Sequence, residues 1–202
     1  MGLLKGTPTI SRYRLLDAPL ELTDAFVQEK LQRHGFVDIE TTAEETSLGW
    51  VEFLDPRATN FDPHAWRFGG FLAFTARIDS RRLPNKILNR YYLIEEAKFV
   101  AETGRKPNAQ KKKEVKESLR LELLRRCLLD TDLLEVLWFT KEREIWLGGA
   151  GEKKRQVFED LWEKTFGLAA RLLAPITMGL EMVTKEQATE LLKTISTSLW
   201  ED

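Results

Sequence analysis

Nine lysine and arginine residues fall within the segment from Arg105 to Arg126, which contains only three acidic residues. The segment carries a net charge of +6 in a chain whose formal total is −1, so the remainder of the chain carries −7. Clustered ammonium and guanidinium groups bind phosphates, and neutralising a polyanion releases its counterions and drives binding without sequence preference. The chemistry that these residues predict is therefore the binding of a polyanion.

A helix is expected to present these charges. Asn108 can cap a helix that runs from about residue 109 to residue 129. On a helical wheel at about 100° per residue, four basic side chains share one arc: Lys112, Lys113, Lys116 and Arg120. Glu114 and Glu122 lie on other faces of the helix. Charge on this helix is therefore largely segregated, whereas a solvated helix often alternates its signs. Two interpretations remain open from charge alone, a phosphate-binding face and a lysine-rich solvated surface.

A second helix is expected just before it, from Pro84 to about Glu102. Four basic residues lie at its start: Arg81, Arg82, Lys86 and Arg90. If the two helices form a hairpin, this cluster and the lysine-rich one are expected at opposite ends, unless the loop folds back. Four leucines direct the C-terminal half of the lysine-rich helix toward a core: Leu119, Leu123, Leu124 and Leu128.

The other segments predict an α+β fold with antiparallel pairing, because strands and helices are mixed rather than strictly alternating. Strands are expected over 9–16, 48–53, 68–78, 133–139 and 144–147, with a loop over 55–64, turns at 130–132 and 140–143, and an extended piece over 172–176. Helices are expected over 24–34, 152–166 and 184–199. We expect one domain over residues 1–202, an antiparallel sheet with several amphipathic helices and a projecting basic helical hairpin at about 84–129.

The composition is that of a soluble globular protein, with 43% apolar and 31% charged residues. No apolar run approaches the roughly 20 residues of a membrane-spanning helix, and no export signal is recognisable at the N-terminus. The single cysteine, Cys127, cannot form an internal disulfide, which fits a reducing cytosol. These features predict a cytoplasmic protein without a membrane partner.

Two other functions compete with polyanion binding. Glu96-Ala97-Lys98, with Asp79 upstream, is similar to the E-x-K of a metal-dependent nuclease, but that motif should lie on a strand and here lies in an expected helix. The other alternative is a protein–protein interaction module whose basic helix docks on an acidic partner. The dispersed histidines and cysteine do not suggest a zinc site, so no metal, cofactor or catalytic residue is expected. Trp66, in a polar loop, is expected to be exposed and free to stack on a base or a partner.

Several short motifs occur in an order that is informative as a whole. They are Gly49-Trp50, a strand ending in Ala76-Arg77, Leu83-Pro84 opening a helix, Arg105-Lys106, a lysine-rich helix ending in LLRR (Leu123 to Arg126), and a strand bearing Trp138. This order, over roughly residues 12–167, resembles the recombination-associated RdgC family. The resemblance implies ring-shaped homodimers that encircle double-stranded DNA without sequence preference, restrain RecA-driven recombination and have no established catalytic residues. It therefore implies a nucleoid-associated protein.

The resemblance also bears on single residues. Arg105 matches a basic position linked with DNA contact in the family, whereas Leu128 falls where the family has a phenylalanine near the DNA-lined hole, and Arg125 replaces a proline. Family members continue beyond the end of this chain, in a part that helps to close the ring, so an open dimer or another oligomer is the alternative to a closed ring. The residues expected to contact double-stranded DNA are Arg105, Lys106, Lys111, Lys112, Lys113, Lys116 and Arg120.

Overall fold

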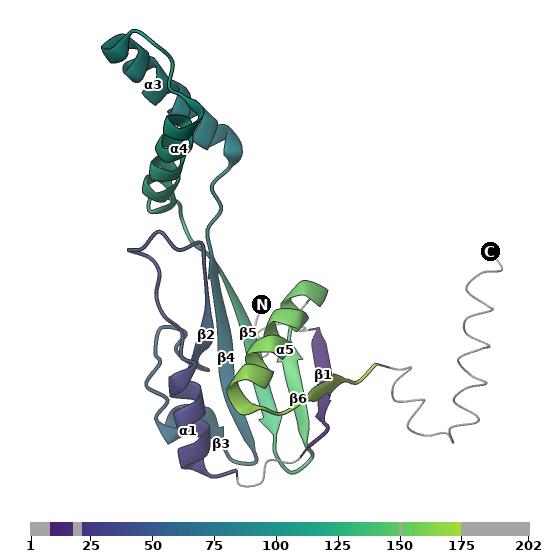
Figure 1. Ribbon diagram of the computed structural model, residues 1–202. Coiled ribbons are helices and arrows are strands. Elements are labelled where there is room, and N and C mark those ends of the chain that lie inside the picture. The colour runs from purple at the N-terminus through teal and green to yellow at the C-terminus, as the bar shows by residue number, and fades with distance from the viewer. Residues whose placement is uncertain (1–8, 18–21, 150, 175–202) are drawn as a thin grey trace, which may run out of the picture.

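Antiparallel pairing joins the described strands into one sheet (Figure 1). The computed structural model describes residues 9–17, 22–149 and 151–174. The described strands are β1 (Ile10–Leu15), β2 (Thr46–Glu52), β3 (Arg67–Phe68), β4 (Phe71–Ser80), β5 (Asp130–Phe139), β6 (Glu144–Gly148) and β7 (Ala170–Leu172). Their order in the sheet is β2-β4-β5-β6-β1-β7, and β3 pairs with β4.

Five described helices accompany the sheet: α1 (Asp24–Arg33), α2 (Pro63–Trp66), α3 (Asn85–Thr103), α4 (Ala109–Leu124) and α5 (Glu152–Phe166). The predicted α+β class with antiparallel pairing is therefore confirmed. The expected helix over 184–199 and the end of the extended piece over 172–176 lie outside the described residues. None of the described helices is long and apolar enough to cross a membrane.

The core lies between one face of the sheet and α5. Trp138 of β5 meets Trp162 of α5 edge-on, with ring centroids 5.0 Å apart, and Phe166 of α5 reaches Trp50 of β2 at 6.3 Å. The indole Nε1 of Trp50 donates to the Thr165 hydroxyl at 2.8 Å, so this polar atom is satisfied inside the core. Large aromatic side chains therefore fix α5 on the sheet.

The expectation that Trp66 is exposed is wrong, because Trp66 is fully buried. The predicted loop over 55–64 leads into the short helix α2, whose first turn is capped by the Asp62 carboxylate accepting from the His64 amide at 3.0 Å. This turn directs the indole into the core, where its Nε1 donates to the carbonyl of Phe61 at 3.1 Å. The polar neighbours in the sequence cap the helix and do not expose the ring.

Three predicted boundaries also need correction. The single strand expected over 68–78 is divided into β3 and β4 by a turn at Gly69, which has a positive φ of 57°. The turn expected at 130–132 is the start of β5, because β4 continues to Ser80 and pairs with Asp130. The lysine-rich helix ends at Leu124 rather than near residue 129, so Leu128 lies beyond it and is 92% exposed instead of buried.

Gly49 of β2 lies under the chain segment that follows α1. The amide of Phe36 donates to the carbonyl of Trp50 at 2.9 Å, and a Cβ built on Gly49 would lie 2.5 Å from both the nitrogen and the Cα of Phe36. Because backbone atoms cannot move aside cheaply, we expect Gly49→Ala to lower the free energy of unfolding by about 1–3 kcal/mol in urea denaturation. Gly70→Ala is the control, since its Cβ would meet no atom within 4 Å. Equal losses in the two variants would contradict this packing.

The α3–α4 hairpin projects from the end of the sheet where β4 ends and β5 begins (Figure 1). Arg81, which the sequence places in a basic cluster with Arg82, Lys86 and Arg90, is buried at the base of the hairpin. Its guanidinium donates to the carbonyls of Ile39 at 2.7 Å, Leu124 at 2.9 Å and Thr42 at 3.0 Å. Burial is tolerated because the charge is surrounded by backbone acceptors. Arg81 therefore joins the end of α4 to the segment that precedes β2.

Candidate nucleic-acid interface

Local sequence signals set the turn at the tip of the hairpin. Helix α3 ends at Thr103 and is capped by Gly104, which has a φ of 70° and whose amide donates to the carbonyl of Val100 at 2.8 Å. Helix α4 begins after Asn108, whose side chain accepts from the Lys111 amide at 2.8 Å. These two caps leave a short exposed loop that carries Arg105 and Lys106. The capping role predicted for Asn108 is confirmed.

The four residues Lys112, Lys113, Lys116 and Arg120 are here called the basic face of α4. Two of them lie against α3. The ammonium groups of Lys112 and Lys116 lie 5.3 Å and 5.1 Å from the centre of the Tyr92 ring, and Lys116 also donates to the Asn89 side chain at 3.1 Å. The cation–π contacts hold the two charges on one side of the hairpin while their ammonium groups keep donors for another ligand.

Arg120 already has an anionic partner. Its Nε donates to a carboxylate oxygen of Glu45 at 3.1 Å, and its Nη2 donates to the same oxygen. The two side chains are 41% and 47% exposed, so the pair is screened by solvent and is expected to contribute little to stability. The hydrogen bond to Glu45 raises the pKa of Arg120. A phosphate that binds Arg120 must therefore compete with the Glu45 carboxylate.

The remaining predicted residues differ in their surroundings. Arg105, Lys106 and Lys113 are exposed and have no ion pair among the residues that the structure describes. Lys111, in contrast, lies 3.6 Å from Glu114, with both side chains about half exposed. Lys111 therefore belongs to a differently charged side of the hairpin. The structure brings Lys112, Lys116 and Tyr92 together and places Arg105 and Lys106 in the loop at the tip.

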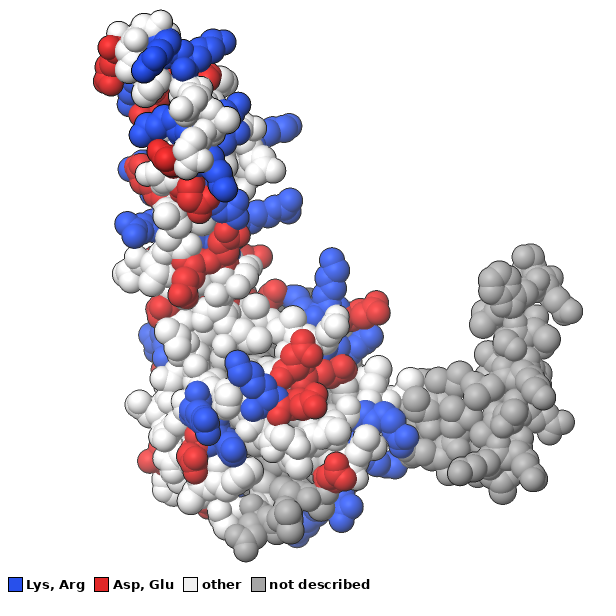
Figure 2. Space-filling model, viewed as in Figure 1, with Lys and Arg blue, Asp and Glu red and all other residues white. Residues whose placement is uncertain are grey.

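The other side of the hairpin, here called the mixed face, carries paired charges. Three ion pairs between neighbouring turns line it, Glu95–Lys98 at 2.6 Å, Lys111–Glu114 at 3.6 Å and Glu122–Arg126 at 2.6 Å. A shallow cavity of about 410 Å³ opens among Glu95, Glu114 and Glu122. Both signs of charge are visible along the projecting hairpin in Figure 2. The segregation of charge thus concerns one side of α4, not the whole hairpin.

Lys86 and Arg90 are two further exposed basic residues of the hairpin, on α3. The hydrogen bond between Asn89 and Lys116 places this part of α3 level with the middle of α4. The expectation that the α3 cluster and the α4 lysines lie at opposite ends is therefore wrong, because antiparallel helices bring residues 86–90 level with residues 116–120. Lys86 and Arg90 are four residues apart on one helix, and this spacing predicts that their side chains lie on the same side of α3.

The residues of the nuclease alternative are engaged elsewhere. The E-x-K lies in α3, as predicted, where Glu96 accepts from the Tyr92 hydroxyl at 3.0 Å and Lys98 pairs with Glu95 at 2.6 Å. Asp79 is fully buried, and its two carboxylate oxygens accept from Arg77 at 2.9 Å and 2.6 Å. Within the described ranges, no group of three or more histidine, cysteine, aspartate or glutamate residues is placed to hold a metal ion.

Comparison with known proteins relates the chain to one family. The family described as "Putative exonuclease, RdgC" matches residues 9–186. A curated relative, the recombination-associated protein RdgC of Cupriavidus necator, is 30% identical over 110 residues. That match covers 54% of this chain and 35% of the relative, so the chain aligns with about a third of the relative's length.

Proposed function

The chain belongs to the RdgC family, and from this premise we propose that it binds double-stranded DNA without sequence preference. We propose further that it acts without catalysis, in the cytoplasm and on the nucleoid, to modulate recombination or replication. The observation that carries the proposal is the separation of charge on the projecting hairpin. Its basic face holds three lysines without a carboxylate partner among the described residues, whereas the mixed face is lined with ion pairs.

The proposed contacts follow from this geometry. The basic face contacts phosphates of the duplex. Arg105 and Lys106 assist from the loop at the tip of the hairpin, and Lys111 assists from the edge of the mixed face. Lysine ammonium groups are point charges that bind phosphate without reading bases, so binding depends on salt more than on sequence. If each protomer neutralises about four phosphates, the slope of log K against log salt is on the order of −4 per protomer.

A fluorescence anisotropy titration tests the proposal directly. Two labelled duplexes of unrelated sequence are titrated with the purified protein over a series of salt concentrations, with and without Mg²⁺. Equal affinities and a slope on the order of −4 are expected. A slope near zero would remove the proposal. No retention of DNA even at low salt would favour the protein-interaction module. Mg²⁺-dependent degradation of the labelled duplex, abolished by Glu96→Ala, would favour a nuclease.

We also propose a homodimer, because a partner copy would present a second hairpin to the same duplex. The resemblance to a ring-forming family motivates this proposal. Light scattering coupled to gel filtration gives the mass in solution, with and without a short duplex. A monomeric mass under both conditions would contradict it, and a larger assembly would indicate another oligomer.

Glu45→Gln is expected to strengthen DNA binding. The change removes the carboxylate that occupies Arg120 and leaves the guanidinium free for a phosphate. Loss of one nearby negative charge acts in the same direction, so we expect the affinity at low salt to rise by about two- to fivefold. Anisotropy titration measures it. Glu122→Gln, which removes an equal charge from the mixed face, is the matched control, and an equal gain there would show that only net charge matters.

A further inference from the structure

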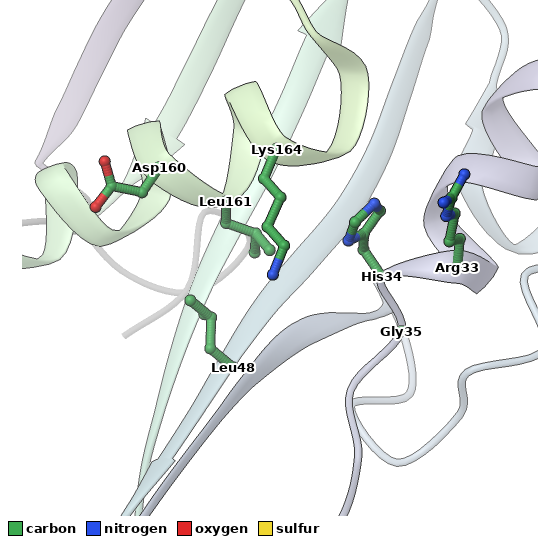
Figure 3. A pocket seen from close by; sticks show the side chains of 7 residues that line it. All are labelled: Arg33, His34, Gly35, Leu48, Asp160, Leu161 and Lys164. Carbon is green, nitrogen blue, oxygen red and sulfur yellow. The ribbon is translucent and has the colours of Figure 1, made fainter.

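A cavity of about 450 Å³ opens between the C-terminal end of α1, β2 and α5 (Figure 3). Leu48 and Leu161 give it an apolar wall, and Gly35 also lines it. The other lining residues are ionisable, and they are Arg33, His34, Asp160 and Lys164. The cavity lies within the size range of small-molecule sites, and its elements are different from those of the hairpin.

The charges around this cavity are unbalanced. In Figure 3 the Lys164 side chain extends into the cavity and the His34 ring points toward it, whereas the Asp160 carboxylate points away from both. Within the described part of the chain, neither Lys164 nor Arg33 forms an ion pair. Burial lowers the pKa of His34, and the positive charges of Lys164, Arg33 and Lys30 lower it further. The cavity therefore gathers Lys164 and Arg33 against a single carboxylate, Asp160, which points away from Lys164 and His34.

We propose that this cavity binds a small oxyanion, the phosphate or carboxylate group of a ligand, between His34 and Lys164. An ammonium group and an imidazolium ring are both hydrogen-bond donors to such a group, and charge-assisted hydrogen bonds are the stronger ones. The volume exceeds that of a bare ion, and the two leucines can contact an apolar part of the ligand. The inference goes beyond the proposed function and does not depend on it.

Protonation of His34 and anion binding are coupled in this site. A bound anion offsets the repulsion from Lys164, Arg33 and Lys30, so it favours the charged imidazolium. By linkage, the affinity for the anion rises as the pH falls through the pKa of His34, and the bound anion raises that pKa by the same free energy. Asp160 on α5 is the one carboxylate that lines the cavity, and β2 contributes no charged group to its lining.

Histidine NMR tests the coupling on the full chain. The chain has two histidines, and the exposed His64 in α2 serves as an internal reference for His34. The Cε1–H shifts are followed against pH with sulfate, whose charge stays constant across a histidine titration, and with sodium chloride at matched ionic strength. We expect sulfate to raise the pKa of His34 by about one unit, which corresponds to tenfold tighter binding to the protonated form. An unchanged pKa, or equal shifts of both histidines, would overturn the proposal.

Variants of α5 identify the cation. Lys164→Gln should abolish the sulfate-dependent rise and, without sulfate, should raise the pKa of His34 by removing a nearby positive charge. Lys153→Gln, in the exposed first turn of α5, removes an equal charge and should leave both values unchanged. A full sulfate response in Lys164→Gln would overturn the assignment.

The same variant distinguishes two sources of the anion. Repeating the NMR titration with acetate tests a carboxylate in place of a sulfate. If the site binds a backbone phosphate of DNA, Lys164→Gln also weakens binding of a duplex in anisotropy titrations. If it binds a free small anion, the affinity for the duplex stays unchanged while the sulfate response is lost. Both outcomes support the oxyanion site, because the variant leaves every residue of the hairpin unchanged.

Discussion

Replacing the four residues of the basic face with glutamine is expected to lower the affinity for duplex DNA by on the order of 100-fold at low salt. The variant combines Lys112→Gln, Lys113→Gln, Lys116→Gln and Arg120→Gln. Each substitution removes one phosphate contact, so the slope of log K against log salt should fall from about −4 toward zero. Because these side chains are exposed or half-buried on the projecting hairpin, the circular dichroism spectrum and the unfolding midpoint should stay near those of the parent.

A charge-matched variant separates the basic face from net charge. It combines glutamine substitutions at four basic residues elsewhere, Lys98, Arg126, Lys141 and Lys153. Lys98 and Arg126 lie on the mixed face in ion pairs, and Lys141 lies in the turn between β5 and β6. This variant should lose less than tenfold in affinity and keep most of the salt slope, through long-range electrostatics alone. An equal loss in the two variants would mean that the basic face makes no specific contact with DNA.

The tip of the hairpin could be predicted because its signals are local. Asn108 and Gly104 cap helices within a few residues of their own positions, and the basic arc follows from the helical period. The contacts of these basic side chains could not be predicted, since their partners lie on other elements of the fold. Arg120 meets Glu45, a residue 75 positions away, and Lys116 meets Asn89 of the preceding helix.

Trp66 and Leu128 show that the burial of a side chain also could not be predicted from its neighbours in the sequence. Trp66 has polar neighbours but is buried, because the short helix α2 turns its ring inward. Leu128 continues an apolar pattern but is exposed, because α4 ends at Leu124 and the chain then enters β5. Local hydropathy describes how a segment can fold, whereas burial depends on where the fold places it. Arg81 is the clearest case, since a charged residue in a basic cluster is among the buried residues of the fold.

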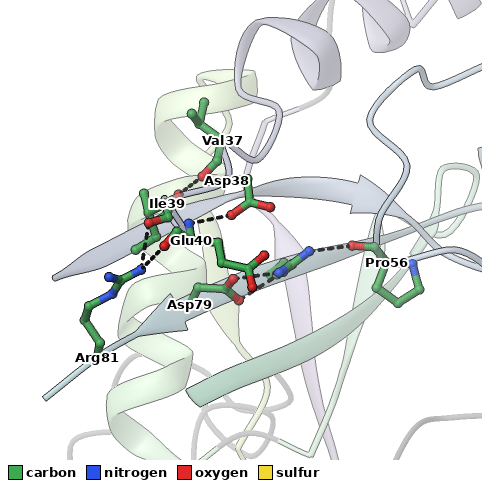
Figure 4. Close-up of polar contacts among 9 residues, drawn as sticks. Val37, Asp38, Ile39, Glu40, Pro56, Asp79 and Arg81 are labelled. Atoms are coloured by element: carbon green, nitrogen blue, oxygen red, sulfur yellow. Dashed lines mark hydrogen bonds and ion pairs between the residues drawn. The ribbon is translucent and has the colours of Figure 1, made fainter. Parts of the chain in front are cut away.

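Arg81→Met is expected to lower the free energy of unfolding by about 3–5 kcal/mol, the largest effect on stability that we anticipate. Figure 4 shows the Arg81 guanidinium bonded to the segment that precedes β2, through the carbonyls of Ile39 and Glu40 at 2.7 Å and 3.4 Å. Its other terminal nitrogen reaches the carbonyls of Thr42 and Leu124. Methionine keeps the aliphatic stem but removes all four charge-assisted hydrogen bonds. The carbonyls of Ile39 and Leu124 each keep one backbone donor, whereas the carbonyls of Thr42 and Glu40 lose the guanidinium. Urea denaturation measures the loss.

Loss of these hydrogen bonds should also loosen the attachment of the hairpin to the sheet and to the segment that precedes β2. The carbonyl of Leu124 is the point where Arg81 contacts α4, so amide hydrogen exchange should accelerate at the base of the hairpin more than in β4 and β5. Binding of duplex DNA should weaken severalfold under conditions where the variant stays folded, because a looser hairpin must be ordered on binding. Arg82→Met is the control, since Arg82 is the exposed neighbour and its replacement should change stability by about 0.5 kcal/mol or less. If both variants lost the same stability, or if exchange rose uniformly, Arg81 would be one more buried contact and not the residue that orients the hairpin.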